Sequence, residues 1–432
     1  MSAVQTLPIQ SSSMDDASGT AWSRLLHGAT ATRPMADLAV HLQTHGSLPA
    51  SLRGAELIAL VEAAGLTGRG GAGFPSHRKL TAVAAGVDPV VVGNGAEGEP
   101  ASRKDRVLLD QVPHLVLDGL QLVARAVGAR TAFVYVHEGP LVERVRAAIA
   151  SRAAARVDAI HVDVVTAPDH FLSGQESAAV SRISGRAALP RAVPPAVYER
   201  GVNRRPTLVQ NVETLAHIAL IARYGADWFR TAGTSQDPGT MLFTVSGAVR
   251  HPGVIEAPVG VTARQLLAQA GWTAPLQALL VGGYHGSWLG VPAGLDLPLS
   301  AGALKPLGLS PGAGVVVAFP ADSCGLVETS RVANYMADVS AGQCGPCLNG
   351  LPALAETFAA LAALQRSPRL TTRIEELCGL VQGRGACHHP DGTTRFVRSA
   401  LVVFEAEVRA HLAGRCTATS RQPVLPTPYE RS

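Results

Sequence analysis

The chain contains 432 residues, of which 47% are hydrophobic and 4% aromatic, and its formal net charge is +4. This length is too great for one ordinary hydrophobic core and predicts about two to four domains. The nearly balanced charge and the few aromatic residues argue against a nucleic-acid partner, which would need a basic surface and rings that stack on bases. The cysteines are unevenly spaced, which indicates metal binding in a reducing cytoplasm rather than a disulfide framework.

The N-terminal region is polar. Residues up to about Ser23 lack the basic start and continuous apolar run of a signal peptide. No stretch of about twenty apolar residues is free of glycine, proline or charge, so we expect no membrane span. Residues 1–50 are predicted to form a partly disordered arm that contains a helix at Met35–Gln43.

Residues 51–236 alternate between helix and strand patterns. Apolar residues recur at helical spacing over Ala55–Gly65, with Gly65 as the C-cap. Short β-branched runs at Pro89–Gly93, Ala132–His137 and Ala159–Thr166 predict buried strands, with alanine-rich helices between them. This alternation is typical of an α/β domain.

Two further regions and a tail follow. Residues 237–322 predict a small α+β module, because strand patterns at Leu242–Val249 and Gly314–Phe319 surround a short helix at Thr262–Ala270. Residues 323–418 show helical periodicity that is interrupted by cysteine-containing turns. Residues 419–432 are expected to be a disordered tail.

A glycine-rich segment, Gly68–Pro75, follows the first predicted helix of the α/β domain. Gly68, Gly70 and Gly73 fit the G-x-G-x-x-G spacing, but the dinucleotide-binding fingerprint requires a strand in front of it, and here a helix precedes. A flexible loop is therefore the simplest interpretation of the glycines alone.

The residues around this segment favour a cofactor site over a plain loop. Glycine lets the backbone approach a phosphate or a flat ring closely, and Arg69 and Lys79 supply positive charge for an anion. Polar and acidic side chains follow one strand later at Asn94, Glu97 and Glu99. Together these features predict a site for flavin mononucleotide (FMN).

Three cysteines in the C-terminal region have the spacing of a metal site. Cys344 and Cys347 form a Cys-x-x-Cys bite, and Cys387 follows forty residues after Cys347. Such thiolates hold iron–sulfur clusters or zinc. Four ligands are usual, and the position three residues before Cys344 is Ala341, which cannot bind a metal.

The sequence leaves three alternatives for these cysteines. They hold a [4Fe–4S] or [3Fe–4S] cluster with three protein ligands, they bind zinc with His388 or His389 as a further ligand, or the metal has been lost. Cys324, Cys378 and Cys416 have no partner at ligand spacing and are expected to be buried thiols.

Several motifs, in order over roughly residues 60–410, give the chain a specific resemblance. It resembles the NADH-binding flavoprotein subunit of respiratory complex I, a family shared with soluble NAD-linked hydrogenases and formate dehydrogenases. The matching stretches are Gly68–Pro75, Asn94–Pro100 with Lys104-Asp105-Arg106, Gly174–Ser177, Arg205-Pro206-Thr207, Asn211–Thr214, and Gly342–Cys347 with Cys387.

This resemblance implies a Rossmann-like α/β flavin domain, a β-grasp module of the SLBB type, and a helical bundle that carries a [4Fe–4S] cluster. It implies paired acids at Glu97 and Glu99, with Glu99 placed to meet an NADH ribose, and cluster ligands at Cys344, Cys347 and Cys387. The residues that it places around FMN are Gly68, Arg69, Gly70, Lys79, Asn94, Gly174, Glu176, Asn211 and Thr214.

The chain departs from the family at the nicotinamide site. Ala96 and Gln175 stand where the family has acidic residues, and Ala82 and Ala196 stand where it has the aromatic residues that stack on adenine. Stacking on an aromatic side chain contributes about 1–3 kcal/mol per base. We therefore expect NADH binding to be weakened.

Two functions are consistent with these features. The chain is either a redox subunit that passes electrons between FMN and an iron–sulfur cluster, or a degenerate paralogue that acts as a docking or scaffolding subunit. In the redox role, the expected partner is a ferredoxin-like or other electron-transfer subunit, with a membrane redox protein as a further option. The expected location is then the cytoplasm, at the inner face of the membrane if the partner is membrane-bound.

Overall fold

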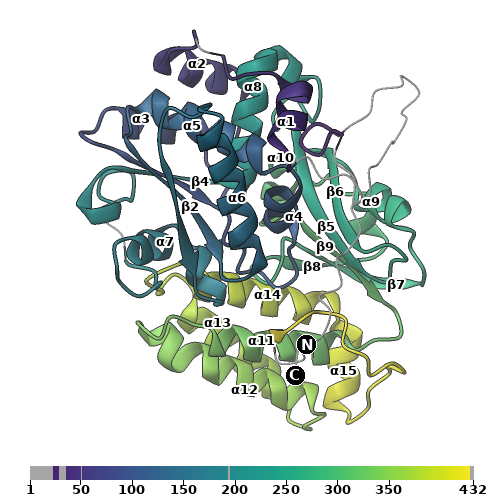
Figure 1. Cartoon of the computed structure of the whole chain (residues 1–432). Coiled ribbons are helices and arrows are strands. Elements are labelled where there is room, and N and C mark those ends of the chain that lie inside the picture. Colours follow the sequence, from purple (N-terminus) through teal and green to yellow (C-terminus); the bar gives the residue numbers. More distant parts are fainter. Residues whose placement is uncertain (1–22, 29–35, 50, 193–194, 429–432) are drawn as a thin grey trace.

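The structure is a computed structural model that describes residues 23–28, 36–49, 51–192 and 195–428. Two sheets lie side by side, and the helices of the C-terminal region form a layer across one end of them (Figure 1). Most of the expected N-terminal arm, residues 1–22, 29–35 and 50, lies outside the described residues, while its helix is present as α1 (Leu38–His45).

The first region is built on a four-stranded parallel sheet. Its order is β3-β2-β1-β4, with β1 at Val90–Asn94, β2 at Thr131–His137, β3 at Val162–Ala167 and β4 at Thr207–Asn211. The central strand β1 begins with three consecutive valines that are fully buried, as expected for a parallel strand that is covered on both faces. The structure confirms the predicted α/β class.

Helices cover both faces of this sheet. α2 ends at Gly65, whose φ of 69° is left-handed, so the predicted glycine C-cap is confirmed. α5 and α8 pack together in the core, where Leu115, Leu120 and Leu215 are fully buried. The helices of this region are α2 (Gly54–Ala64), α3 (Ser76–Ala84), α4 (Lys104–Gln111), α5 (Pro113–Val127), α6 (Pro140–Ala154), α7 (Glu176–Ile183) and α8 (Val212–Arg230).

The second region is a mixed five-stranded sheet of the β-grasp type. The strands are β5 (Thr240–Gly247), β6 (Gly253–Pro258), β7 (Leu276–Val281), β8 (Ser287–Gly290) and β9 (Val315–Pro320), in the order β6-β5-β9-β7-β8. The central pair β5–β9 is parallel and the other pairs are antiparallel. Helix α9 (Ala263–Ala270) buries Leu266 and Leu267 in a core that it shares with β5 and β9, and the four-residue helix α10 (Ala301–Leu304) also contributes to it.

The third region is helical and shares a core with the β-grasp sheet. The rings of Trp288 on β8 and Phe404 have centroids 5.1 Å apart, which joins the two regions through a buried aromatic contact. The helices are α11 (Gly325–Asp338), α12 (Leu351–Ala362), α13 (Leu370–Val381), α14 (His389–Val403) and α15 (Glu405–Leu412), and a single π-helical turn, Pro346–Gly350, leads into α12.

The C-terminal segment differs from the disordered tail that the sequence predicted. The Glu328 carboxylate on α11 accepts hydrogen bonds from the backbone N–H groups of Val424 (3.1 Å) and Leu425 (2.9 Å). The Tyr284 hydroxyl donates to the Pro426 carbonyl oxygen at 2.5 Å. The Glu328 carboxylate and the Tyr284 hydroxyl therefore hold the segment Val424–Pro426 against the helical region, and residues 429–432 lie outside the described residues.

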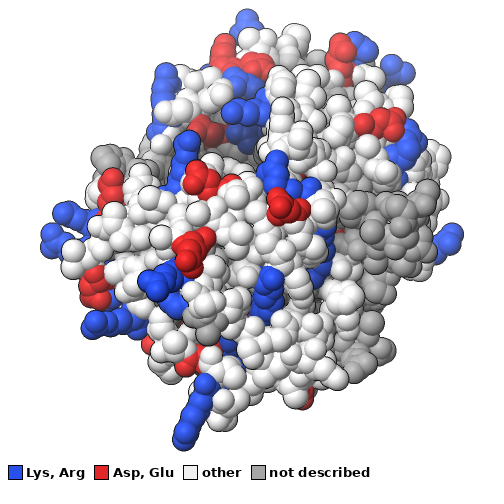
Figure 2. All heavy atoms as spheres, turned by 90° about the horizontal axis from the view of Figure 1, so that it is seen from above, with Lys and Arg blue, Asp and Glu red and all other residues white. Residues whose placement is uncertain are grey.

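The surface carries charges of both signs. On the face in Figure 2, Lys and Arg side chains are interspersed with Asp and Glu, without a large patch of one sign. Within the described ranges, no single helix is long and apolar enough to cross a membrane, although α4 and α5, bent by 95° at their junction, meet that length and composition together.

Candidate functional site

The strand order places the topological switch point of the sheet between β1 and β4, and we call this position the β1–β4 crevice. The chain leaves β1 toward β2 on one side, and it adds β4 on the other side. Ligands of open α/β sheets bind beside the carboxyl ends of two such strands. Asn94 and Asn211 are the last residues of β1 and β4 and are paired in register. The Asn94 amide donates to the Gly174 carbonyl oxygen at 2.7 Å, and the Asn211 amide donates to Asp105 at 2.7 Å.

The glycine-rich loop lies over the β4 side of this crevice. Its ends are closed by a hydrogen bond from the Gly68 N–H to the Phe74 carbonyl oxygen (2.9 Å). The Arg69 N–H donates to the Thr214 hydroxyl near the start of α8 (2.9 Å). A Cβ at Gly70 would lie 3.2 Å from the Asn211 Cβ. The fold therefore brings Gly68, Gly70, Asn211 and Thr214 together, as the sequence predicted.

Arg69 has a different environment from the one expected of an exposed anion ligand. The residue is buried, and its guanidinium donates to the Pro238 carbonyl oxygen (2.9 Å) and the Thr67 hydroxyl (3.2 Å). Burial lowers the pKa of Arg69, although the nearby Glu213 carboxylate raises it. These contacts attach the loop to the linker that leads to the β-grasp module.

Lys79 and Glu176 join the two sides of the crevice. The Lys79 ammonium on α3 lies 2.9 Å from the Glu176 carboxylate at the start of α7. Gln175 is the N-cap of α7, and its side-chain oxygen accepts hydrogen bonds from the N–H groups of Ser177 (2.7 Å) and Ala178 (3.0 Å). Gly174 precedes it, and a Cβ at this position would overlap the Ala96 carbonyl oxygen. Only glycine fits there.

The paired acids have partners within the chain. Glu97 accepts hydrogen bonds from the Ser102 hydroxyl and from the Asp105 N–H at 3.3 Å. Glu99 accepts from the N–H of Tyr284 in the β-grasp module at 2.7 Å and from the Ala101 N–H at 3.2 Å. Burial raises the pKa of each carboxyl to about 7, although these N–H donors lower it.

A buried cation, Lys104, lies beside the crevice, and the sequence motifs did not indicate a role for it. The Lys104 ammonium lies 2.6 Å from Asp105, 3.0 Å from Glu213 and 3.3 Å from the Asn211 side-chain oxygen. Burial would lower the pKa of Lys104, but Asp105 and Glu213 raise it above its ordinary value. Lysine side chains are rarely fully buried unless they are paired with acidic groups. The sequence motif did not indicate that Lys104 is buried and paired in this way.

The crevice suits a phosphate-bearing ring cofactor. It combines a glycine loop, two amide side chains, the start of α8 and the Lys79 ammonium, while the charge of Lys104 is balanced by Asp105 and Glu213. Backbone N–H groups at a helix start and a nearby cation are the groups that bind phosphate. The donor set of this structure therefore fits FMN.

The three predicted cluster cysteines come from two neighbouring turns. The sulfur atoms of Cys344 and Cys347 are 3.6 Å apart, and Cys347 lies in the π-helical turn Pro346–Gly350. The Ala386 N–H donates to the Cys344 sulfur, which places the segment just before Cys387 beside it. Burial would raise the pKa of Cys344, but the N–H groups of Ala386 and Cys347 lower it overall, whereas burial raises the pKa of Cys347 and Cys387.

The two neighbouring histidines have different environments. The His388 side chain is fully exposed and lies 3.9 Å from Asp391. His389 is buried, with Nε2 at 2.7 Å from the Met336 carbonyl oxygen and Nδ1 at 3.0 Å from the His285 ring. Both nitrogens of His389 therefore have protein partners, and His388 is the histidine that the zinc alternative would use.

The other cysteines agree only in part with the sequence expectation. Cys324 and Cys378 are buried, as predicted, but Cys416 is exposed. Cys324 and Cys416 also lie together with His411, with one ligand atom of each residue within 4.8 Å of the others. The expectation that Cys416 is a buried thiol was therefore wrong, and the three side chains are brought together by residues distant in sequence that meet at the end of α15.

Comparisons with protein families agree with this division of the chain. Residues 61–220 match the Nuo51 FMN-binding domain, residues 242–279 match the SLBB domain, and residues 328–411 match the NADH-ubiquinone oxidoreductase-F iron-sulfur binding region. The chain thus contains an FMN-binding domain and an iron–sulfur binding region.

Similar proteins extend the match over most of the chain. A NADH-quinone oxidoreductase subunit of Rhizobium meliloti is 32% identical over 379 residues, which cover 83% of this chain and 89% of that protein. A second relative, a NADH-quinone oxidoreductase subunit of Escherichia coli, is 31% identical over 375 residues, which cover 82% and 84%. A chain of NAD⁺-reducing [NiFe]-hydrogenase in the H₂-reduced state superimposes with a TM-score of 0.79 at 31% identity.

The match to the hydrogenase covers 84% of this chain but only 63% of the hydrogenase chain. The family models match all three regions of this chain, in the order of the sequence. The chain belongs to the family of NADH-binding flavoprotein subunits, as a divergent member.

Proposed function

We propose that this chain passes electrons between FMN, held at the β1–β4 crevice, and an iron–sulfur cluster on Cys344, Cys347 and Cys387, and exchanges them with a protein partner. FMN, when bound, supplies the conversion between two-electron and one-electron transfer. The single observation that carries the proposal is that one fold holds both donor sets, the crevice around Asn94 and Asn211 and the paired sulfurs of Cys344 and Cys347.

Each side of the crevice has a role in this proposal. The backbone at Gly70 and the start of α8 face the phosphate in this proposal, with Lys79 as the nearby cation. Asn94 and Asn211 hold Gly174 and Asp105 in place at the ends of the two strands. The Lys79–Glu176 pair closes the open side, and Gly174 leaves room for the Ala96 carbonyl.

A packed contact links the crevice with the cysteine region. A Cβ at Gly98, between the paired acids, would overlap the Phe171 carbonyl oxygen. The Phe171 ring lies 5.7 Å from the ring of His389 and 4.9 Å from that of His285. His389 follows Cys387 by two residues. This continuous packing supports electron transfer between the two sites, because it connects them through protein atoms in contact.

The nicotinamide site is proposed to be weakened. Ala82 on α3 and Ala196 offer no ring for adenine, and Ala96 offers no carboxylate. Gln175 caps α7 with its side-chain oxygen. Glu99 already accepts hydrogen bonds from the N–H groups of Tyr284 and Ala101. NADH is therefore a poor donor, and a reduced electron-transfer protein is the preferred one.

The exposed surface beside the cysteines fits an electron-transfer partner. Leu348 directly follows Cys347 and is 61% exposed, and Leu380 on α13 is 54% exposed. Exposed apolar side chains around a redox centre are suited to docking a protein. The similar proteins are subunits of NADH-quinone oxidoreductase and a chain of NAD⁺-reducing hydrogenase, which supports an electron-transfer partner in the cytoplasm.

A scaffolding role is the second candidate. It is favoured by Ala341, which replaces a cluster ligand, and by the capping role of Gln175. Reduction experiments separate the two functions. The redox proposal predicts that a low-potential chemical reductant bleaches flavin and cluster absorbance quickly, while NADH does so slowly. Protein that shows no visible absorbance after anaerobic purification would support the scaffolding function.

A further inference from the structure

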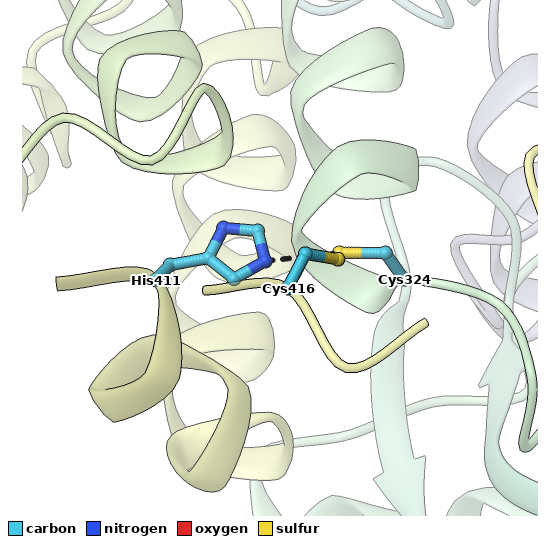
Figure 3. Close-up of side chains that lie close together, drawn as sticks. All are labelled: Cys324, His411 and Cys416. Atoms are coloured by element: carbon cyan, nitrogen blue, oxygen red, sulfur yellow. Dashed lines mark hydrogen bonds between the residues drawn. The ribbon is translucent and has the colours of Figure 1, made fainter. Parts of the chain in front are cut away.

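A second group of soft metal ligands lies where α11 begins and α15 ends. It consists of Cys324, His411 and Cys416, and it is separate from Cys344, Cys347 and Cys387. Figure 3 shows the two thiols pointing toward one another with the His411 ring directed at them. The Cys324 sulfur and His411 Nε2 are 3.5 Å apart, and the three ligand atoms all lie within 4.8 Å of one another.

These separations suit a single ion. Zinc binds sulfur at about 2.3 Å and imidazole nitrogen at about 2.0–2.1 Å in tetrahedral geometry, which puts two such ligands about 3.6 Å apart. The distance between Cys324 and His411 matches this value without movement. Thiolate and imidazole ligands together favour zinc over hard cations such as magnesium.

His411 is already oriented as a metal ligand. Its side chain is fully buried, and Nδ1 lies 3.1 Å from the Leu361 carbonyl oxygen. Because a carbonyl oxygen only accepts, Nδ1 carries the proton and Nε2 presents its lone pair to Cys324. A hydrogen bond of this kind on the second ring nitrogen is typical of zinc-binding histidines.

Cys324, like His411, is held in place by neighbouring groups. It is the N-cap of α11, and its sulfur lies 3.5 Å from the Val327 N–H and 3.3 Å from a carboxylate oxygen of Glu407. The Glu407 carboxylate, one turn before His411, accepts from the Gly325 N–H at 2.9 Å and so links α15 to the start of α11. Glu407 is thus a positioning residue for Cys324.

Cys416 belongs to the segment that continues into the packed C-terminal tail. Three residues later the Thr419 N–H donates to the Asp322 carbonyl oxygen at 2.9 Å, as does that of Ser420. Cys416 itself is exposed, so one side of the group faces solvent. A ligand bound here would join the beginning of α11 to the tail.

We propose that Cys324, His411 and Cys416 bind one zinc ion, with water in the fourth position, and that this ion fastens the C-terminal segment to α11. Binding releases the two thiol protons. The role is structural and does not depend on flavin or iron–sulfur chemistry.

The test uses the full chain with Cys344→Ser and Cys387→Ser, which removes the other thiolate site. After chelator treatment under reducing, anaerobic conditions, zinc is titrated against a chromophoric competitor. We expect one tightly bound zinc per chain, and a loss of affinity of roughly 100-fold or more when Cys416→Ser is added. Cobalt in place of zinc should give the absorption of tetrahedral thiolate ligation, and this too should depend on Cys416.

Cys416→Ser should leave folding intact because the side chain is exposed, and Thr417→Ser, at the exposed neighbouring position outside the group, is the matched control. Unchanged zinc affinity in the Cys416→Ser chain overturns the proposal. Recovery of a Cys324–Cys416 disulfide from anaerobically prepared protein overturns it as well.

Discussion

Asn94 and Asn211 end two adjacent parallel strands, and the Asn211 amide lies 3.4 Å from the Asn94 carbonyl oxygen. This pair lies at the carboxyl end of β1, the strand that has β2 on one side and β4 on the other. The glycine loop, the start of α8 and the buried Lys104 all reach it. The position of the proposed flavin site follows from this strand order and not from the glycine motif alone.

The first prediction concerns the glycine loop. Gly70→Trp should abolish FMN binding, because even a Cβ at this position lies 3.2 Å from Asn211 and an indole would occupy the crevice. Gly68→Ala is the matched control, since its Cβ would meet the Phe74 carbonyl oxygen at an ordinary 3.6 Å. Flavin released by denaturation is measured by fluorescence. Equal amounts of bound flavin in the Gly70→Trp and unsubstituted proteins would contradict the assignment of the glycine loop to the FMN site.

The second prediction concerns NADH. Oxidation of NADH with an artificial acceptor should be slow, and the double variant Ala82→Phe, Ala196→Phe should lower KM by about 10-fold or more, because one stacked base contributes about 1–3 kcal/mol. Steady-state kinetics over a range of NADH concentrations test this. A micromolar KM with turnover near 10 per second in the unsubstituted protein would contradict a weakened site.

The third prediction concerns the missing cluster ligand. Ala341→Cys should slow the loss of iron and sulfide in air, because a fourth thiolate replaces an exchangeable ligand. Ala341→Ser is the matched control, since it adds a polar group of similar size without a thiolate. Decay of the broad visible absorbance is followed in parallel for both variants. Equal decay rates would count against a cluster at these cysteines.

The fourth prediction concerns pH. Burial raises the pKa of Glu99 to about 7 from its ordinary value of 4.5, so the folded chain retains a proton that the unfolded chain releases in this window. Stability therefore falls as pH rises from 4.5 to 7, and the penalty is complete above pH 7. Glu99→Gln should gain about 2–3 kcal/mol relative to the unsubstituted protein between pH 5 and pH 8, given about 1.4 kcal/mol per pKa unit.

Denaturant unfolding at several pH values measures this difference. Glu143→Gln, at an exposed carboxylate on α6, is the control and should leave the pH profile unchanged. A Glu99→Gln profile that runs parallel to that of the unsubstituted protein would show that Glu99 does not retain its proton in the folded state.

Much of the fold was predictable because its signals are local. The β-branched runs of β1 and β2 and the glycine cap of α2 were identified to within a few residues. Strand β4 was missed, because its five residues follow Pro206 and carry no alternating pattern. β6 and β8 were missed for a similar reason, since each is short and is fixed by its neighbours in the sheet.

The candidate sites were likewise predictable only in part. The sequence motifs predicted that Gly70, Asn94 and Asn211 belong together. They did not predict that Arg69 turns to the Pro238 carbonyl, because that contact depends on how the β-grasp module packs. The group of Cys324, His411 and Cys416 escaped notice because tertiary packing, and not spacing, brings α11 and the tail together.

The central claim is that this fold holds a flavin and a cluster in one chain. It is tested most directly by the flavin, iron and acid-labile sulfide content of anaerobically purified protein, together with its visible spectrum before and after dithionite. We expect about one FMN per chain, about three or four iron atoms with matching sulfide, and bleaching of both absorbances on reduction. Protein that contains neither flavin nor iron after anaerobic reconstitution would contradict it.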